Sequence, residues 1–153
     1  MLFRTHITFG LFVYLLFFSY FQQPILTLVG FLIGVIIVDL DSKNSKIGKR
    51  WYFRPIQWFT KHRKIFHTAF FGIIITSIIA TASIEIGVGF FFGFTSHLIL
   101  DSLTIRGIAP LHPFTQKKIS GYIRSGGIAE DVLFVFFLIS DIALVFVNLI
   151  YLT

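Results

Sequence analysis

The sequence predicts an all-α integral membrane protein, with about five transmembrane helices in a single domain over residues 1–153. Three observations predict this class. Hydrophobic residues make up 56% of the chain, and the mean hydropathy is +0.86. Charged residues make up only 13%, against the roughly 25% that soluble domains carry. Long apolar runs recur along the chain, so we expect the first run to be a retained helix rather than a cleaved signal peptide.

The first two predicted helices cover residues 7–21 and 25–38. Gln22, Gln23 and Pro24 interrupt the apolar run between them, and so short a link predicts a helical hairpin. Both segments are shorter than the roughly 20 residues of a standard transmembrane helix. A re-entrant pair of helices is therefore the alternative.

A basic polar loop is predicted over residues 39–64. It mixes eight Lys and Arg residues with the aromatic residues Trp51, Tyr52, Phe53, Trp58 and Phe59. This mixture is typical of chain that lies at the level of the lipid headgroups. We expect the loop to lie along the membrane surface, with a short amphipathic helix near residues 56–62.

Three further helices are predicted over residues 65–82, 84–103 and 129–152, with a second polar loop over residues 104–128. Twelve of the thirteen Lys and Arg residues lie in the two long loops, and Arg4 lies at the N-terminus. Cytoplasmic loops carry such a positive excess. The chain is therefore expected to be a multi-pass protein of the inner (cytoplasmic) membrane, with its N-terminus and both long loops inside.

This topology brings most of the titratable residues to one membrane face. All five His residues and five of the seven acidic residues fall at the predicted inner ends of helices or in the inner loops. Glu85 falls at the outer face, and Asp141 lies inside the fifth predicted helix. Chance would spread these residues over both faces, so we expect a polar site under the inner headgroups.

His97 and Asp101 give the strongest local signal for a metal site. They are four residues apart, which places both side chains on one face of a helix. An imidazole and a carboxylate at this spacing can hold one divalent cation, although a helix-end pair that satisfies itself is the alternative. With His67, this pair is expected to hold one metal ion.

A second ion is expected to involve Asp39, Asp41 and His6. Two carboxylates as close as Asp39 and Asp41 repel each other unless a cation relieves them, although the same residues also suit a plain turn. His62 and His67 are five residues apart and do not share a helical face, and His62 is as readily a surface residue. The chain has no Cys, so nitrogen and oxygen ligands favour zinc, with manganese or iron as alternatives.

The expected chemistry is phosphoester hydrolysis, because paired divalent metals activate water and stabilise charge on both reacting oxygens. Arg63, Lys64, Arg106 and Arg124 lie in the same inner loops, and Arg side chains match phosphate oxygens with two donors. This favours membrane lipid as a partner and an anionic phosphoester as the substrate. Glu130, at the start of an apolar helix, is the expected general base, with Arg63 as the second catalytic residue.

Several ordered elements resemble the YdjM-like membrane-bound metal-dependent hydrolases, a family described as LexA-binding and inner-membrane-associated. These elements are Arg4-Thr5-His6, Asp39-Leu40-Asp41-Ser42, His62-Arg63 with His67-Thr68, Ser96-His97-Leu98-Ile99-Leu100-Asp101, Gly107, Pro110, and Ser125-Gly126 with Glu130. The resemblance implies metal-dependent hydrolysis at a membrane. It implies that the functional positions are His6, Asp39, Asp41, His62, His67, His97 and Asp101. Val38 stands where the family often has Pro, and this removes no candidate ligand.

Two other classes of function remain as alternatives. A non-catalytic membrane anchor or regulatory protein would use the polar cluster structurally, and its basic loops would bind anionic lipid or a cytosolic protein. A metal or proton transporter would need polar residues through the bilayer midplane, and the segment centres are almost wholly apolar. Nucleic-acid binding is disfavoured, because the membrane topology already explains the net charge of +6. The sequence assigns no role to His112.

Overall fold

The computed structural model describes residues 1–41, Trp51 and residues 66–152. Within these residues the chain forms α1 (Phe3–Leu16), η1 (Phe18–Tyr20), α2 (Pro24–Ile37), η2 (Val38–Asp41), α4 (Ala69–Ala82), α5 (Ile84–Ser102) and α6 (Ile128–Leu152). The described part contains no β-strand. The prediction of an all-α fold is confirmed.

Local chemistry explains where the helices begin. Pro24 opens α2 from a position whose amide would have no intrahelical partner. Thr68 caps α4 by accepting from the amide of Phe71 at 3.2 Å, so this helix begins after the predicted residue 65. Ser83 caps α5 by accepting from the amide of Ile86 at 3.3 Å, and it alone separates α4 from α5.

The first predicted helix differs most from the structure. It was expected over residues 7–21, whereas α1 runs from Phe3 to Leu16. It begins earlier because the amides of Thr5 and His6 donate to the carbonyl of Leu2, at 3.1 and 3.3 Å. The surface helix expected near residues 56–62 lies outside the described residues.

Two helices are long and apolar enough to cross a membrane by length and composition, Ile84–Ser102 and Ile128–Ile150. The other three described helices are apolar but have 14 residues each. Such a helix is roughly 21 Å long, against a hydrocarbon core of about 30 Å. The structure therefore supports a helical membrane protein without fixing five crossings.

Helices α2 and α5 pack backbone against backbone. A Cβ atom at Gly93 would lie 2.1 Å from the carbonyl oxygen of Phe31, and one at Gly34 would lie 2.3 Å from that of Phe90. Gly30 and Gly89 meet the facing helix in the same way, one turn earlier on each helix. Small residues four apart allow this close approach between membrane helices. His97 follows Gly93 by one turn, so the same face carries its ring to the end of α2.

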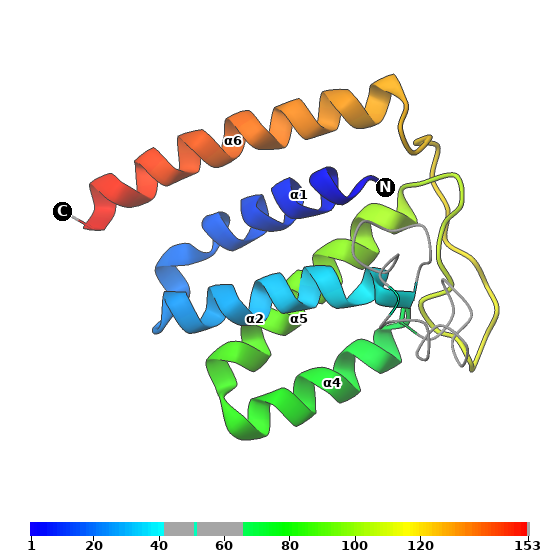
Figure 1. The fold of residues 1–153 in the computed structure, drawn as a ribbon, viewed down its shortest axis with the longest axis horizontal. Coiled ribbons are helices and arrows are strands. Elements are labelled where there is room, and N and C mark those ends of the chain that lie inside the picture. Colours follow the sequence, from blue (N-terminus) through cyan, green and yellow to red (C-terminus); the bar gives the residue numbers. More distant parts are fainter. Residues whose placement is uncertain (42–50, 52–65, 153) are drawn as a thin grey trace.

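The polar ends of the helices gather at one end of the bundle. Figure 1 shows the starts of α1, α4 and α6 and the ends of α2 and α5 on the same side, with α1 beside α6 and α4 beside α5. The chain between α5 and α6 lies at this end too. Its two arms are joined by backbone bridges, one between Thr104 and Ile123 and one between Ile108 and Ile119.

Candidate metal centre

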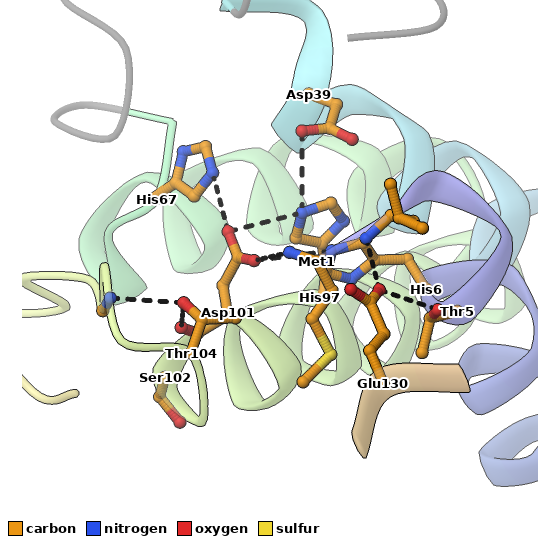
Figure 2. Close-up of polar contacts among 12 residues, drawn as sticks. Met1, Thr5, His6, Asp39, His67, His97, Asp101, Ser102, Thr104 and Glu130 are labelled. Carbon is orange, nitrogen blue, oxygen red and sulfur yellow. Dashed lines mark hydrogen bonds and ion pairs between the residues drawn. The ribbon is translucent and has the colours of Figure 1, made fainter. Parts of the chain in front are cut away.

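Asp101, buried in the last turn of α5, lies among three imidazole rings. Its Oδ1 atom is 3.4 Å from Nε2 of His6, and its Oδ2 atom is 3.3 Å from Nε2 of His67 and 4.0 Å from Nε2 of His97. Figure 2 shows these rings around the carboxylate, together with the α-amino nitrogen of Met1, which lies 2.7 Å from Oδ1. A carboxylate removed from water needs such partners.

His97 is held in the orientation expected of a metal ligand. Its Nδ1 atom lies 2.8 Å from the carbonyl oxygen of Val35. A carbonyl oxygen only accepts, so Nδ1 carries a proton and Nε2 presents its lone pair to the cluster. Nε2 is buried and has no hydrogen-bond partner among the described residues. Metal-ligating His residues commonly donate their other N–H in this way.

His6 joins the cluster through ring stacking. Its ring lies on that of His97, with centroids 3.7 Å apart and an interplanar angle of 8°. Its Nδ1 atom is buried without a hydrogen-bond partner among the described residues. The first turn of α1 therefore delivers a ligand to the end of α5.

The ligand atoms fall into two overlapping groups. One group is His6, His97 and Asp101, and the other is Asp39, His67 and His97; within each, the ligand atoms lie within 4.8 Å of one another. The sequence had placed His67 with Asp101, and His6 with Asp39. The structure groups them differently because α1 stacks His6 directly on His97. His67 also remains close to Asp101, as expected.

Glu130 lies beside the cluster and ties three segments together. Its Oε1 atom accepts from the amide of Leu2 and from the hydroxyl of Thr5 at 2.8 Å, and its Oε2 atom accepts from the amide of Gly126. The side chain is fully buried. Glu130 thus holds the start of α1, and with it His6, against the start of α6 (Figure 2).

The remaining predicted site residues are placed as follows. His62, Arg63 and the side chain of Asp41 lie outside what the structure describes. Among the described residues, His112 belongs to neither ligand group.

The sequence did not predict three supporting contacts. The carbonyl of Val35 and the hydroxyl of Thr5 were not singled out, nor was Thr104, whose hydroxyl donates to the carbonyl of Asp101 at 2.7 Å. Thr5 directly precedes the candidate ligand His6, and Thr104 follows Asp101 by three residues, so closeness in sequence to a candidate ligand was the available signal for both. A backbone carbonyl such as that of Val35 has no side-chain signature.

Comparison with known proteins decides the family. The family model described as YdjM inner membrane protein matches residues 1–152. The chain belongs to the YdjM family. Protein YvsG of Bacillus subtilis (strain 168), described as uncharacterized, is 30% identical over 115 residues, covering 72% of each chain. No solved structure matches this YdjM family member.

The family and the two long apolar helices together support membrane localisation. The residues present fit a divalent cation. The donors are imidazole nitrogens and carboxylate oxygens, a set that suits zinc, manganese or iron. The buried Nε2 of His97 has no hydrogen-bond partner among the described residues, and such a cation would give its lone pair a partner.

Access to the cluster is uneven. The side chains of His6, His67, His97 and Asp101 are at most 3% exposed, whereas that of Asp39 is 16% exposed. Asp39 lies 3.9 Å from Nε2 of His97, so it borders the most accessible side of the cluster.

Proposed function

We propose that this YdjM family protein is a membrane-embedded, metal-dependent hydrolase that acts on a phosphoester of a lipid or lipid-linked substrate at the inner leaflet. One observation carries the proposal: three buried imidazoles surround Asp101, and the Nε2 lone pair of His97 is directed among them. Buried carboxylates and imidazoles at this density are costly without a cation.

The proposed topology has five membrane crossings with the N-terminus inside. The gathering of the polar helix ends at one end of the bundle supports it, because one membrane face then carries the site. The loop between α5 and α6 adds Arg106, Lys117, Lys118 and Arg124 to the same end. Basic residues of this kind mark the cytoplasmic side.

The proposed ligands are His6, Asp39, His67, His97 and Asp101, for one or two ions with zinc favoured. A divalent cation held there would polarise a phosphoryl oxygen as a Lewis acid. Val35 fixes the tautomer of His97 through its carbonyl, and Glu130 fixes the start of α1 that carries His6. These contacts keep the ligands in place before any substrate arrives.

Glu130 and Arg63 are the proposed catalytic residues. The Oε1 atom of Glu130 already accepts two hydrogen bonds, whereas Oε2 accepts one, from Gly126. An ionised carboxylate oxygen has two lone pairs, so Oε2 retains capacity to take a proton. Arg63 would bind the phosphate, and its place in the structure lies outside the described residues.

A second candidate function is a structural metal site in a membrane anchor. The near-complete burial of His6, His67, His97 and Asp101 favours it, because structural sites are closed whereas catalytic sites keep an open position. The partial exposure of Asp39 favours the hydrolase instead.

Elemental analysis combined with a hydrolysis assay tests the proposal. The full chain, purified in neutral detergent and dialysed, is expected to retain zinc and to release phosphate from short-chain phosphatidic acid or a fluorogenic phosphodiester. Asp101→Asn is expected to lose both properties. Asp131→Asn, an exposed control that removes the same charge, is expected to keep both.

The possible results separate the two candidates. Zinc retained without hydrolysis of any phosphoester supports the structural site and contradicts the hydrolase. Absence of bound zinc, manganese and iron in the wild-type protein contradicts both.

A further inference from the structure

The loop between α5 and α6 forms a pocket beside the end of α5, and backbone hydrogen bonds hold its walls together. The amide of Ile105 donates to the carbonyl of Ile123 at 3.0 Å, and the amide of Ile123 donates to that of Leu103 at 3.1 Å. Gly121 lies so close to Leu103 that a Cβ atom would come within 2.4 Å of its carbonyl oxygen. The two arms of the loop are therefore held together by the backbone.

Two arginines, one from each arm, line this pocket. It has a volume of about 530 Å³ and is lined by Ile105, Arg106, Ile123, Arg124 and Ser125. Arg106 and Arg124 follow the paired residues Ile105 and Ile123 directly, so the backbone bonds between the arms bring them to one place. Two guanidinium groups and a hydroxyl offer many donors, and the pocket lining contains no acidic side chain.

The acidic side chains that the structure describes lie outside the lining of this pocket, and the side chain of Asp41 is not among the described ones. Asp101 faces three imidazoles, Glu130 accepts three hydrogen bonds, and Asp131 pairs with Arg4. The other described acids are Asp39 beside His97, Glu85 bonded to Gln23 and Ser83, and Asp141 within α6. Residues 42–65 contain no Asp or Glu. No described carboxylate forms an ion pair with Arg106 or Arg124, and both side chains are exposed, so their guanidinium groups can bind an anion from outside the chain.

Ile105 is an exposed apolar side chain that lines the pocket, and Tyr122 and Ile128 are exposed residues close to it in the sequence. Ile105 is 59% exposed, and Tyr122 and Ile128 nearby in the chain are 97% and 83% exposed. A phosphate that carries hydrocarbon chains would bind the guanidinium groups and cover the exposed side chain of Ile105. Inorganic phosphate would satisfy the charge alone.

The geometry points to a binding site for the phosphate of an anionic phospholipid headgroup at Arg106 and Arg124. This site is separate from the metal centre and concerns binding rather than hydrolysis. It rests on the proposed function only for its place at the surface of the inner leaflet. Lipid held there would anchor the end of α5, which carries Asp101, at the headgroup level.

A lipid-binding measurement on the full chain in neutral detergent tests this site. The probe is fluorescent short-chain phosphatidylglycerol at about 0.15 M salt, where exposed charges more than about 8 Å apart are largely screened. We expect Arg106→Gln/Arg124→Gln to weaken binding about 30-fold, from about 1 kcal/mol for each basic residue. Lys117→Gln/Lys118→Gln, which removes two charges from the same loop outside the pocket, is expected to change binding less than about 3-fold.

Further arms complete the design. Phosphatidylcholine is expected to bind at least about 10-fold more weakly than phosphatidylglycerol, and millimolar inorganic phosphate is expected to leave the lipid bound. Arg106→Lys/Arg124→Lys is expected to retain partial binding, because Lys keeps the charge but not the paired donors. Thermal melting shows whether each variant is folded. If Arg106→Gln/Arg124→Gln is unfolded, Arg106→Lys/Arg124→Lys takes its place in the comparison.

Any of three results overturns the inference. The first is an equal loss of lipid binding in Arg106→Gln/Arg124→Gln and in Lys117→Gln/Lys118→Gln, and the second is unchanged binding in Arg106→Gln/Arg124→Gln. The third is displacement of the lipid by millimolar inorganic phosphate. The same samples give the zinc content. Failure of the lipid site with zinc retained is therefore distinguishable from failure of the proposed function.

Discussion

Helices α5 and α6 are both long and apolar enough to cross a membrane, yet they have different environments. In α5, 56% of the most apolar 18-residue window is buried, whereas in α6 the share is 11%. Helix α5 packs against α1, α2 and α4, while α6 lies along α1 (Figure 1). Hydropathy follows the same order, because the exposed span of α6 is the more apolar of the two.

Each of these helices carries a buried carboxylate, and the two differ in their partners. Asp101 at the end of α5 meets two imidazoles from other segments of the chain and one from its own helix. Asp141 within α6 is 4% exposed, and neither of its oxygens has a hydrogen-bond partner among the described residues. An aspartate is thus part of a polar site in α5, whereas in α6 the burial of an unpaired aspartate lowers the stability of the fold.

The largest expected effect is at Asp101. Asp101→Asn removes the charge that pairs with the buried α-amino group of Met1 at 2.7 Å, and breaking a buried ion pair costs about 3–5 kcal/mol. Thermal unfolding in detergent, with a chelator present, measures this cost without metal. The exposed control Asp131→Asn is expected to cost less than about 1 kcal/mol. Equal melting temperatures for the two variants would contradict the central role of Asp101.

The next effect concerns the close packing that positions α5. Gly93→Leu places side-chain atoms against the carbonyl of Phe31, and overpacking of this kind costs about 3 kcal/mol. Ala143→Leu adds the same bulk at an exposed position of α6 and is expected to leave unfolding nearly unchanged. Size-exclusion profiles and melting curves give the comparison. A well-folded Gly93→Leu protein would show that α2 and α5 do not pack through their backbones.

A smaller effect is expected at Glu130, which joins α6 to α1. Glu130→Gln replaces an accepting oxygen with an NH₂ group, so one of the amides of Leu2 and Gly126 loses its acceptor. The expected loss of stability is about 2 kcal/mol. Zinc affinity should fall as well, because Thr5 and His6 move with the start of α1. Loss of hydrolysis at full stability and full zinc affinity would instead assign Glu130 to proton transfer alone.

The smallest effect has the opposite sign. Asp141→Asn replaces a buried carboxyl group that no described group compensates with an amide of the same size that cannot ionise, and we expect stability to rise by about 1 kcal/mol. Zinc content should not change, because Asp141 belongs to neither ligand group among the described residues. A clear drop in melting temperature would mean that Asp141 has a partner and that the contrast with Asp101 is false.

The sequence predicted the helices well because their signals are local. Pro24, Thr68 and Ser83 act on the next few residues, and their effect does not depend on the rest of the fold. The start of α1 was less predictable, because helical bonds to Leu2 extend it past the apolar run that marks the helix in the sequence.

The site was predictable in its members more than in its arrangement. The spacing of His97 and Asp101 is visible in the sequence, and both lie in the cluster. The stacking of His6 on His97 depends on how α1 packs against α5, which no local pattern specifies. The use of the Val35 carbonyl follows from the glycine contacts between α2 and α5, since only close backbones bring that carbonyl to His97.

The zinc K-edge X-ray absorption spectrum of the full chain, dialysed after loading with zinc, tests the shared cation site most directly. The account predicts nitrogen and oxygen ligands at about 2.0–2.2 Å and no sulfur. It also predicts outer-shell scattering from at least two imidazoles, because each ligand group contains two His residues. Zinc that is lost on dialysis, or a spectrum without imidazole scattering, would contradict the account.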